Sequence, residues 1–430
     1  MIIEKGQRVD ISQLNDIIIR MEQDICDTLA HRTLSVETVV SALDQLSQKI
    51  AFGAYDQKIS ELSSAHAEEY KEQVVRMMRR ENIEYKIKME LGDDLRHAVM
   101  TNPPLGQSAI QVRPMPLGVI LHIAAGNMDG LPAFSLVEGF LSGNVNILKL
   151  PQSDNGLSLE IIAGLVEIEP QLSNYIYVFD TPSSDVATIK KLSEMADGIV
   201  IWGGEAAVGA VRRMAPPGAK IIEWGHKLSF AYISGYEDED RELRLLADHI
   251  IKTDQVLCSS CQTIFLDTEE MDEVYRFCEK FLPILEGSSQ MHASKSLGIR
   301  ADKTLRRHFE NMNRLLTRNK NCSGDCYQGI GCSLSAQIDS APELSNMFGH
   351  VRVKRLPSQH IVSGLRPYKT VLQTAGLICL PEKRDALTDR LLRSGVVRVT
   401  RAGTMSALFS GEAHDGDYPM RRYVRITNVE

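Results

Sequence analysis

Between residues 117 and 234, short runs rich in β-branched residues alternate with segments of helical spacing. The runs LGVILHIA, VNILKL, YIYVF, GIVIW, AKIIE and LSFAYI predict buried strands. The segments between them, among them GLPAFSLVEGFLSG, LSLEIIAGLVEIE, DVATIKKLSEMA and EAAVGAVRRMA, predict helices. This alternation predicts βαβ units, a mostly parallel sheet and an α/β fold. Ligands of such sheets bind beyond the carboxyl ends of the strands, which directs attention to the loops HIAAGN, KLPQSDN, IWGGE and IEWGHK.

The regions on either side have different patterns. Residues 10–95 predict helices that pack on something larger, and residues 101–118, with their prolines, predict an extended arm. From about residue 239 a second α/β unit begins with DRELRLLADHII, QTIFL and EEMDEVYRFCEKFLPIL. Residues 318–340 predict a loop or irregular strands, and YVRITNVE predicts a final strand.

Composition narrows the class of protein. The chain has 430 residues, enough for two or three domains, and 43% of them are hydrophobic. A net charge of −8 without a strongly basic block argues against nucleic acid as the main partner. The start, MIIEKGQRVDISQLND, lacks the pattern of a secretory signal, and no uninterrupted apolar stretch reaches the roughly 20 residues that span a bilayer. We therefore expect a cytoplasmic protein without a membrane span.

The stretch DQVLCSSCQTIFLD places Cys258 three positions before Cys261. A metal site that adds Cys322, Cys326 or Cys332 would have uneven ligand spacing. A redox pair would normally open a helix, whereas a strand is predicted here. A buried pair of free thiols and a single nucleophilic thiol are the other two interpretations, and this stretch alone does not decide among the four.

A nucleophilic thiol needs a donor for the developing oxyanion and a group that moves protons. Asn127 ends the loop HIAAGN, although an Asn at a helix start is usually an N-cap. Glu223 closes the strand AKIIE, although a single Glu at a strand end is usually solvated. Both residues fall on loops predicted at the carboxyl edge of the sheet.

Several segments resemble the aldehyde dehydrogenase superfamily in the same order along the chain. They are PLGVILHIAAGN, GNVNILKLP, IWGGEAAVGAVRRMA and IIEWGHKLSFAYI, within residues 101–285. Within that superfamily, HIAAGN, CSSCQ and the tail FSGEAHDGDYPMRRYVRI are most similar to the LuxC-type acyl-CoA reductases, the fatty-acid reductases. The resemblance implies a Rossmann-like cofactor domain at 101–226 after a helical lead-in at 1–100. It also implies a catalytic thiol domain at 227–405 and an oligomerisation tail at 406–430.

The resemblance implies roles for three catalytic residues. Cys258 matches the nucleophile that attacks a thioester. Asn127, with the backbone N–H of Cys258, would form the oxyanion hole, and Glu223 matches the general base or proton relay. Cys261 replaces a proline of the family pattern, so it either packs or forms a resting disulfide with Cys258.

The cofactor residues are implied in the same way. Lys149 matches the lysine that holds the adenosine ribose, Gly203 and Gly204 match the turn under the pyrophosphate, and Ala125 belongs to the cofactor-side loop. Gln152 stands where NAD-preferring relatives often carry Glu. A neutral residue does not repel a 2′-phosphate, so NADPH is favoured, with NADH possible.

A further cofactor residue follows from ELSNMFGHV, residues 343–351, which resembles a segment with a ribose-binding Glu; Asn346 holds that position here. The implied function is NADPH-dependent reduction of an acyl thioester to an aldehyde through an acyl-cysteine. The acyl group, fatty by resemblance, would come from acyl-CoA, an acyl-protein or an acyl-transferring partner enzyme. Residues 105–115 and YVRIT resemble pairing elements and imply at least a homodimer.

Three alternatives remain open. The first is an acyl-phosphate reductase of the glutamyl-phosphate type, against which the HIAAGN loop and the tail HDGDYPMRR argue. The second is a non-catalytic protein that kept the fold, and the third is a metal-dependent regulator that uses the cysteines. No residue identifies the length of the acyl chain.

Overall fold

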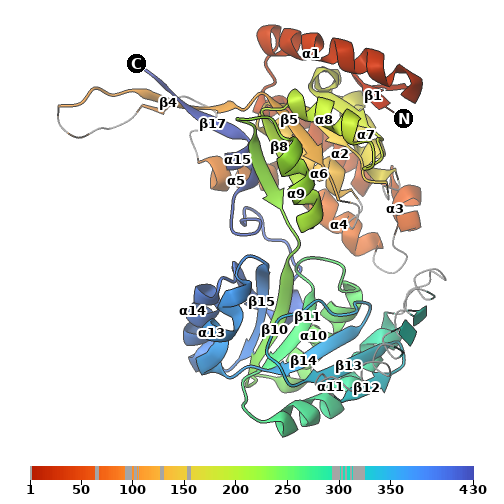
Figure 1. The fold of residues 1–430 in the computed structure, drawn as a ribbon, viewed down its shortest axis with the longest axis vertical. Helices are drawn as coiled ribbons and strands as arrows, with labels where there is room; N and C mark the ends of the chain where they lie inside the picture. The colour runs from red at the N-terminus through yellow and green to blue at the C-terminus, as the bar shows by residue number, and fades with distance from the viewer. Residues whose placement is uncertain are drawn as a thin grey trace. The chain divides into compact units, whose positions relative to one another are not determined.

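The computed structural model describes residues 2–62, 67–92, 99–100, 104, 106–125, 130–152, 156–292, 301, 304–305, 308–309, 312 and 325–430. These residues form two compact units, each with its own sheet (Figure 1). Unit 1 contains the N-terminal helices, Ala67–Gly225 and Leu408–Glu430. Unit 2 contains His226–Ala407.

The sheet of unit 1 has seven strands in the order β2-β1-β7-β6-β5-β8-β9. The five strands from β7 to β9 are parallel, whereas β1 pairs antiparallel with β2 and β7. The bounds are β1 Ile2–Glu4, β2 Gln7–Val9, β5 Val119–Ile123, β6 Val145–Lys149, β7 Ile176–Phe179, β8 Gly198–Trp202 and β9 Lys220–Trp224.

Helices surround this sheet and share one apolar core with it. The N-terminal helices are α1 Leu14–His31, α2 Val36–Ala51, α3 Asp56–Leu62, α4 Ala67–Met78 and α5 Arg80–Leu91. The crossover helices are α6 Leu131–Leu141, α7 Leu157–Ile168, α8 Val186–Glu194 and α9 Glu205–Met214. Side-chain caps fix helix starts: Ser35 accepts a hydrogen bond from Thr38 N–H before α2, and Asp185 accepts one from Thr188 N–H before α8.

The sheet of unit 2 also has seven strands, in the order β12-β13-β14-β11-β10-β15-β16. All pairs are parallel except β12 with β13. The bounds are β10 Leu228–Ser234, β11 Cys261–Leu266, β12 Cys326–Gly329, β13 Cys332–Gln337, β14 His350–Arg355, β15 Leu372–Cys379 and β16 Arg398–Arg401.

Helices cover both faces of the second sheet because its central strands are apolar on both sides. Ala231 and Ile264 pack toward α10 (Glu239–Lys252) and α11 (Met271–Met291). The neighbouring Phe230 and Phe265 point the opposite way, into a core shared with α13 and α14. These two helices span Ile361–Leu365 and Arg384–Ser394.

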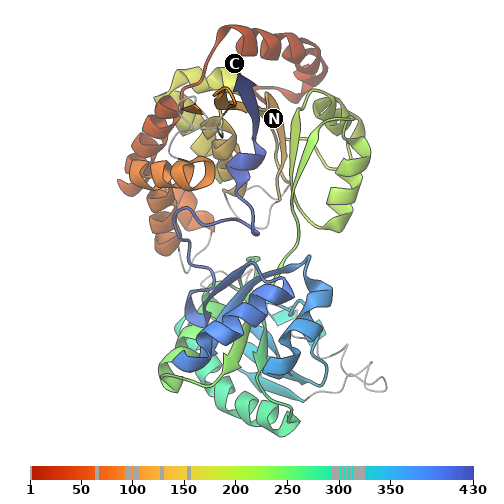
Figure 2. The same ribbon diagram turned by 90° about the vertical axis from the view of Figure 1, so that its left-hand side faces the viewer.

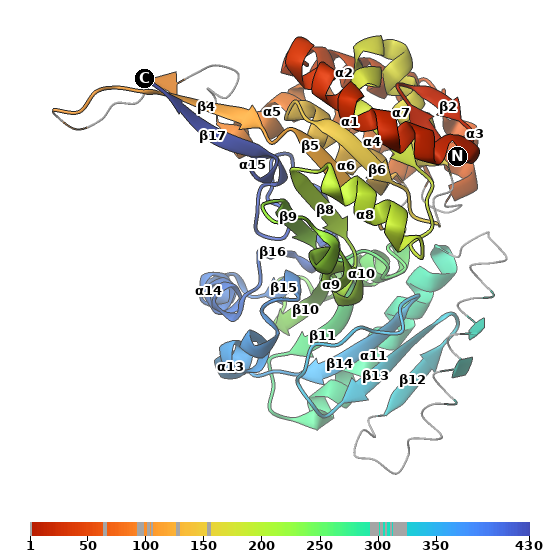
Figure 3. The ribbon, with the colours of Figure 1, turned by 45° about the horizontal axis from the view of Figure 1, so that its top comes forward.

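The C-terminal segment returns to unit 1, where it lies beside α5 and α6 (Figure 2). It contains α15 (Pro419–Arg422) and β17 (Val424–Val429). Figure 3 shows β17 beside β4 (Gln111–Pro116), and with β3 (Val99–Met100) they form a small antiparallel sheet. Met420 N–H donates to the buried Glu90 carboxylate of α5, which anchors the segment.

The predictions of an α/β class and mostly parallel sheets are confirmed, as are the strands and helices expected between residues 117 and 291. Two differences stand out. The N-terminal region is not wholly helical, since β1 and β2 extend the first sheet, and residues 350–401 add three parallel strands that the sequence did not predict. Among the described residues, no helix is both long and apolar enough to cross a membrane.

Candidate active site

The strand register of unit 1 aligns two predicted site residues in one row at the carboxyl edge of the sheet. Lys149 of β6 pairs with Ile123 of β5, Ile123 pairs with Ile201 of β8, and Ile201 pairs with Glu223 of β9. Parallel strands all end on the same edge, so residues at equivalent register share it. Lys149 therefore ends β6 and Glu223 is the penultimate residue of β9, with the ends of β5 and β8 between them.

Lys149 is almost fully buried, and its ammonium donates to Ser183 Oγ at 2.9 Å. Burial lowers the pKa of Lys149, and the nearby Asp180 carboxylate opposes that shift. Thr181, on the same segment between β7 and α8, is buried, and its hydroxyl has no hydrogen-bond partner among the described residues. Buried polar atoms are usually paired, so this segment offers a hydroxyl and an ammonium to a polar ligand.

Gly203 and Gly204 lie between β8 and α9. Gly203 N–H donates to Trp224 O at 3.2 Å, which ties this turn to the end of β9. Gly204 is the N-cap of α9 and has no side-chain cap; a Cβ there would meet nothing within 4 Å. Backbone N–H groups at a helix start without a side-chain cap, together with open space, suit a phosphate, although Glu205 in the first turn adds a negative charge.

Glu223 is not simply solvated, as a single strand-end carboxylate was expected to be. The Arg212 guanidinium, from α9, binds both carboxylate oxygens, with Nη2 at 2.9 Å from Oε2. This ion pair raises the pKa of Arg212. Arg212 is largely exposed, at 64%, so the ion pair lies at the protein surface within unit 1.

An aromatic group that was not predicted from the sequence lies at the ends of β8 and β9. Trp202 ends β8 and Trp224 ends β9, with ring centroids 5.7 Å apart. His414, from the C-terminal segment, lies 5.2 Å from the Trp202 ring and 4.8 Å from the Trp224 ring. The tail motif HDGDYPMRR therefore packs against the two tryptophans that end β8 and β9. The tail motif is recognisable in the sequence, but the residues that it contacts could not be predicted from it.

Two further predicted residues of unit 1 lie just after strand ends in the sequence. Ala125 follows β5 and is half-buried, and Gln152 is an exposed residue in the turn after β6. Asn127 lies outside the described residues.

In unit 2, Cys258 lies in the turn between α10 and β11, is partly exposed and is not disulfide-bonded. Its backbone carbonyl accepts a hydrogen bond from Ser229 Oγ at 2.6 Å, and Ser229 Oγ in turn accepts one from Thr374 N–H. Leu257 N–H donates to Ser260 Oγ at 3.2 Å, and Ser260 N–H donates to Leu257 O at 3.0 Å. The backbone around the thiol is thus held from both sides.

Cys261 has a different environment from Cys258. It begins β11, is fully buried and is likewise not disulfide-bonded. Burial raises the pKa of Cys261 to about 12, so it stays protonated at neutral pH. Of the two options for Cys261, packing is the one seen here, whereas a resting disulfide with Cys258 is not.

Other cysteines were considered as metal ligands. Cys326 begins β12 and Cys332 begins β13, whereas Cys322 lies outside the described residues. Within the part of the chain that the structure describes, no group of three or more His, Cys, Asp or Glu residues could hold a metal ion.

Asn346 is half-buried in a turn that precedes β14. The next two residues, Met347 and Phe348, have left-handed backbone angles with φ of 59° and 53°. Non-glycine residues adopt this conformation only where surrounding contacts hold them.

The two sheets and their helices correspond to a known architecture. The NADP-dependent glyceraldehyde-3-phosphate dehydrogenase of Bacillus halodurans aligns with a TM-score of 0.70 and 14% identity, over 100% of this chain and 98% of that one. Aldehyde dehydrogenase 21 of Physcomitrella patens aligns with a TM-score of 0.72 and 11% identity, over 98% and 91%. At such low identity the likeness establishes the fold, which is that of the aldehyde dehydrogenases.

The family follows from the sequence. Residues 31–426 match the family described as Acyl-CoA reductase (LuxC), and the chain belongs to that family. The long-chain acyl-protein thioester reductase of Aliivibrio fischeri is 23% identical over 74% of this chain and 65% of its own length. The enzyme of the same name from Vibrio harveyi is 24% identical over 76% and 67%. The chain thus spans about two thirds of the length of these curated relatives.

Proposed function

We propose that this protein reduces an acyl thioester to an aldehyde with NADPH, through a covalent acyl-cysteine at Cys258. The observation that carries the proposal is the contrast between two neighbouring thiols in a chain of the acyl-CoA reductase family. Cys258 is partly exposed in a turn with a fixed backbone, whereas Cys261 is buried and protonated. The names of the relatives support a long-chain acyl-protein thioester as the class of substrate.

In the proposed reaction the Cys258 thiolate attacks the thioester carbonyl carbon, and the carrier thiol leaves with a proton. Thioester exchange of this kind needs little driving force, because one thiolate replaces another. The Asn127 amide and the Cys258 backbone N–H would donate to the oxyanion that forms during attack. Glu223 would relay the proton, which requires that at least one carboxylate oxygen leave Arg212.

The residues of unit 1 fit a nicotinamide dinucleotide. Lys149 and Ser183 would hold the adenosine ribose, with the unpartnered Thr181 hydroxyl beside them. The open N-terminus of α9 at Gly204 would hold the pyrophosphate. When bound, the cofactor supplies the hydride that reduces the acyl carbon, after which the aldehyde leaves and the Cys258 thiolate is regenerated.

The proposed preference for NADPH rests on charge. Gln152 is neutral, so it adds no repulsion to the cofactor's 2′-phosphate. Asn346, from unit 2, is proposed to hydrogen-bond a ribose hydroxyl, and Ala125 to line the cofactor side of the loop after β5.

We also propose that the chain forms a homodimer through the small sheet. Its edge strand β17 exposes Ile426 at 61%, and the adjacent β4 exposes Met115 at 42%. An exposed strand edge with apolar residues favours pairing. Light scattering on the purified protein should give the mass of a dimer, and Ile426→Asp should shift it toward a monomer; a monomeric wild-type protein would contradict the proposal.

The function is tested by NADPH oxidation with acyl-CoA thioesters of increasing chain length, an acyl-protein thioester and an acyl phosphate. The expected result is aldehyde formation from a thioester, and a wild-type adduct of acyl mass at Cys258 when NADPH is omitted. Reduction of the acyl phosphate alone would favour the rival reductase. Neither reduction nor an adduct with any donor would refute the proposal.

A further inference from the structure

The turn that carries Cys258 is joined to the turn that carries Asn346 by a buried glutamine. Gln255, three residues before the thiol, is 1% exposed. Its Nε2 donates to Cys261 O at 2.9 Å, at the end of the turn that carries Cys258. The same nitrogen also donates to Ser345 Oγ at 3.1 Å and to His350 O at 3.2 Å, in the turn that carries Asn346. Its Oε1 accepts from Gly349 N–H at 2.9 Å. The backbone partners fix the orientation of the amide, because an N–H only donates and a carbonyl only accepts.

A second buried glutamine completes the connection. Gln262, the last residue of the CSSCQ motif, donates through Nε2 to Gln255 O at 2.7 Å. Its Oε1 accepts from Ser345 Oγ at 2.6 Å and from Ser345 N–H at 3.3 Å. Ser345 Oγ also accepts from Met347 N–H at 3.0 Å. Neither the proposed catalytic role of Cys258 nor the proposed cofactor-binding role of Asn346 accounts for these contacts.

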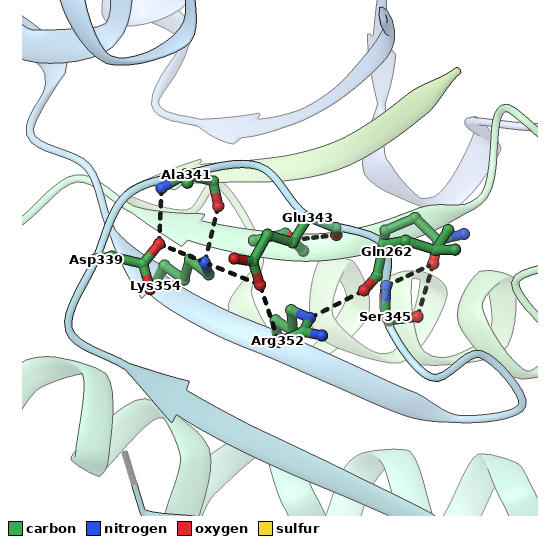
Figure 4. Close-up of polar contacts among 9 residues, drawn as sticks. Gln262, Asp339, Ala341, Glu343, Ser345, Arg352 and Lys354 are labelled. Carbon is green, nitrogen blue, oxygen red and sulfur yellow. Dashed lines mark hydrogen bonds and ion pairs between the residues drawn. The ribbon is translucent and has the colours of Figure 1, made fainter. Parts of the chain in front are cut away.

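The segment before Ser345 is itself pinned to β14, as Figure 4 shows. The buried Lys354 ammonium donates to Asp339 Oδ1 at 2.6 Å and to Ala341 O at 2.8 Å. Arg352 pairs with Glu343 at 3.0 Å and donates through Nε to Leu344 O at 3.1 Å. Ser345 is therefore a fixed point, and a movement of the glutamines away from it would break buried hydrogen bonds.

Backbone angles on both sides are consistent with such a clamp. Asp254 and Gln255 have φ of 47° and 59°, and Met347 and Phe348 on the opposite turn are also left-handed. The two left-handed pairs meet directly, since Phe348 N–H donates to Asp254 O at 2.9 Å. Strained backbone of this kind persists where several contacts hold it, and it concentrates at functional sites.

We infer that Gln255 and Gln262 are positioning residues that join the Cys258 turn (254–261) and the Asn346 turn (345–350) into one rigid element. The inference deepens the proposed function and rests on it for the roles of Cys258 and Asn346. Its consequence is that the thiol and the cofactor-side asparagine keep a fixed relation within unit 2. A substitution that loosens one turn should then also loosen the other.

Hydrogen–deuterium exchange on the full-length protein tests this coupling without any activity. Ser345→Ala removes the hydroxyl shared by both glutamines, and we expect backbone amides of residues 254–261 to exchange roughly tenfold faster. Ser340→Ala is the matched control. Ser340 lies in the same segment as Ser345, but its hydroxyl donates to Arg355 O on β14 and not to either glutamine. We expect it to leave residues 254–261 unchanged.

Acceleration confined to residues 345–350 in Ser345→Ala would overturn the inference. Gln262→Leu is the reciprocal variant, made on the thiol side and read on residues 345–350, and it decides the matter if Ser345→Ala does not fold. If the wild-type protein reduces no thioester, the proposed function fails, but the exchange experiment still decides whether the two turns are coupled.

Kinetics give a second readout. Gln255→Glu keeps the shape but places a carboxylate oxygen where Nε2 faces two carbonyl oxygens, so the thiol turn should shift. Small displacements of a reacting group cost about 100-fold in rate, so we expect kcat to fall by that order with KM within about twofold. Turnover is expressed per Cys258 thiol titrated as its acyl adduct in the absence of NADPH, which excludes protein that has lost the acylation site.

Gln328→Glu, the same charge change at an exposed position on β12, is the control and should keep its turnover. A kcat per titrated thiol equal to that of the wild-type protein in Gln255→Glu would show that Gln255 only stabilises the fold.

Discussion

The two units hold their candidate site residues by different means. In unit 1, Glu223 is bound by Arg212, a side chain that is 64% exposed, and the Gly204 N-terminus of α9 has no side-chain cap. In unit 2, the Cys258 turn is bound through Ser229, Gln255 and Gln262, all of which are buried.

This difference has a physical consequence. An exposed ion pair contributes little to stability, so Glu223 can be released from Arg212 without disturbing the sheet. A buried amide whose partner moves loses about 1–3 kcal/mol for each unsatisfied group, so the thiol turn resists displacement. Glu223 is therefore suited to rearrangement during the reaction, whereas the Cys258 turn is suited to a fixed geometry.

Removing the thiol should have the largest effect. Cys258→Ser replaces the proposed nucleophile by a weaker one, and we expect turnover to fall by at least about 10⁴-fold, as for other covalent catalysts. Thioester-dependent NADPH oxidation measures it. Cys26→Ser, at an exposed cysteine of α1, is the control and should retain activity. Full activity in Cys258→Ser would end the assignment.

The next largest effect concerns the donor proposed on the unit 1 side. Asn127→Ala should lower kcat by ~100- to 1,000-fold, because a single oxyanion donor contributes that much. KM for the thioester should change little, since the oxyanion exists only during attack. Asn174→Ala, at a half-buried asparagine of unit 1 whose amide donates to Gln171 O, is a suitable control. An unchanged kcat would remove Asn127 from the mechanism.

The sequence predicted the positions of Lys149 and Glu223 well, because both follow β-branched runs and the ends of parallel strands share one edge. It did not predict Arg212 as the partner of Glu223. Helical periodicity places Arg212 on α9, but it does not say which strand end the side chain reaches.

The sequence was less informative about unit 2 for a similar reason. The charged residues of β14, HVRVKR, are of a type that usually faces solvent, yet Lys354 is fully buried against Asp339 and Ala341. Buried polar pairs such as Gln255 with Ser345 join residues 90 positions apart, and neither spacing nor residue type reveals such a pairing. Local patterns fix strands and helices, whereas these contacts depend on the assembled fold.

A smaller effect is expected for the substitution that tests the proposed preference for NADPH. Gln152→Glu adds a negative charge at an exposed position next to the proposed ribose site, where it should repel a 2′-phosphate and accept bonds from a 2′-hydroxyl. We expect the ratio of kcat/KM for NADPH to that for NADH to fall by about tenfold, equivalent to about 1.4 kcal/mol. Gln111→Glu, on β4, is the control and should leave the ratio unchanged. An unchanged ratio in Gln152→Glu would show that Gln152 does not face the ribose.

The smallest expected effect is on the pH dependence of stability, and it concerns one buried histidine in each unit. His122 in unit 1 contacts Ser135 and Asn146, whereas His249 Nε2 in unit 2 has no hydrogen-bond partner among the described residues. Burial lowers the pKa of each imidazole to about 4, with Arg398 adding to the shift for His249. The folded state therefore keeps both histidines neutral, while the unfolded chain takes up protons below pH 6.5.

Stability should consequently decrease as pH falls through 6.5 toward 4, by about 0.7 kcal/mol per histidine between pH 7 and pH 6. His249→Leu should remove this term from unit 2 only. Both tryptophans belong to unit 1, so their fluorescence reports that unit, whereas far-ultraviolet circular dichroism reports both. In denaturant titrations at the two pH values, His249→Leu should flatten the pH dependence seen by circular dichroism and leave that seen by fluorescence. Replacement of the exposed His360 should change neither, and equal changes in both signals for His249→Leu would show that the units unfold as one.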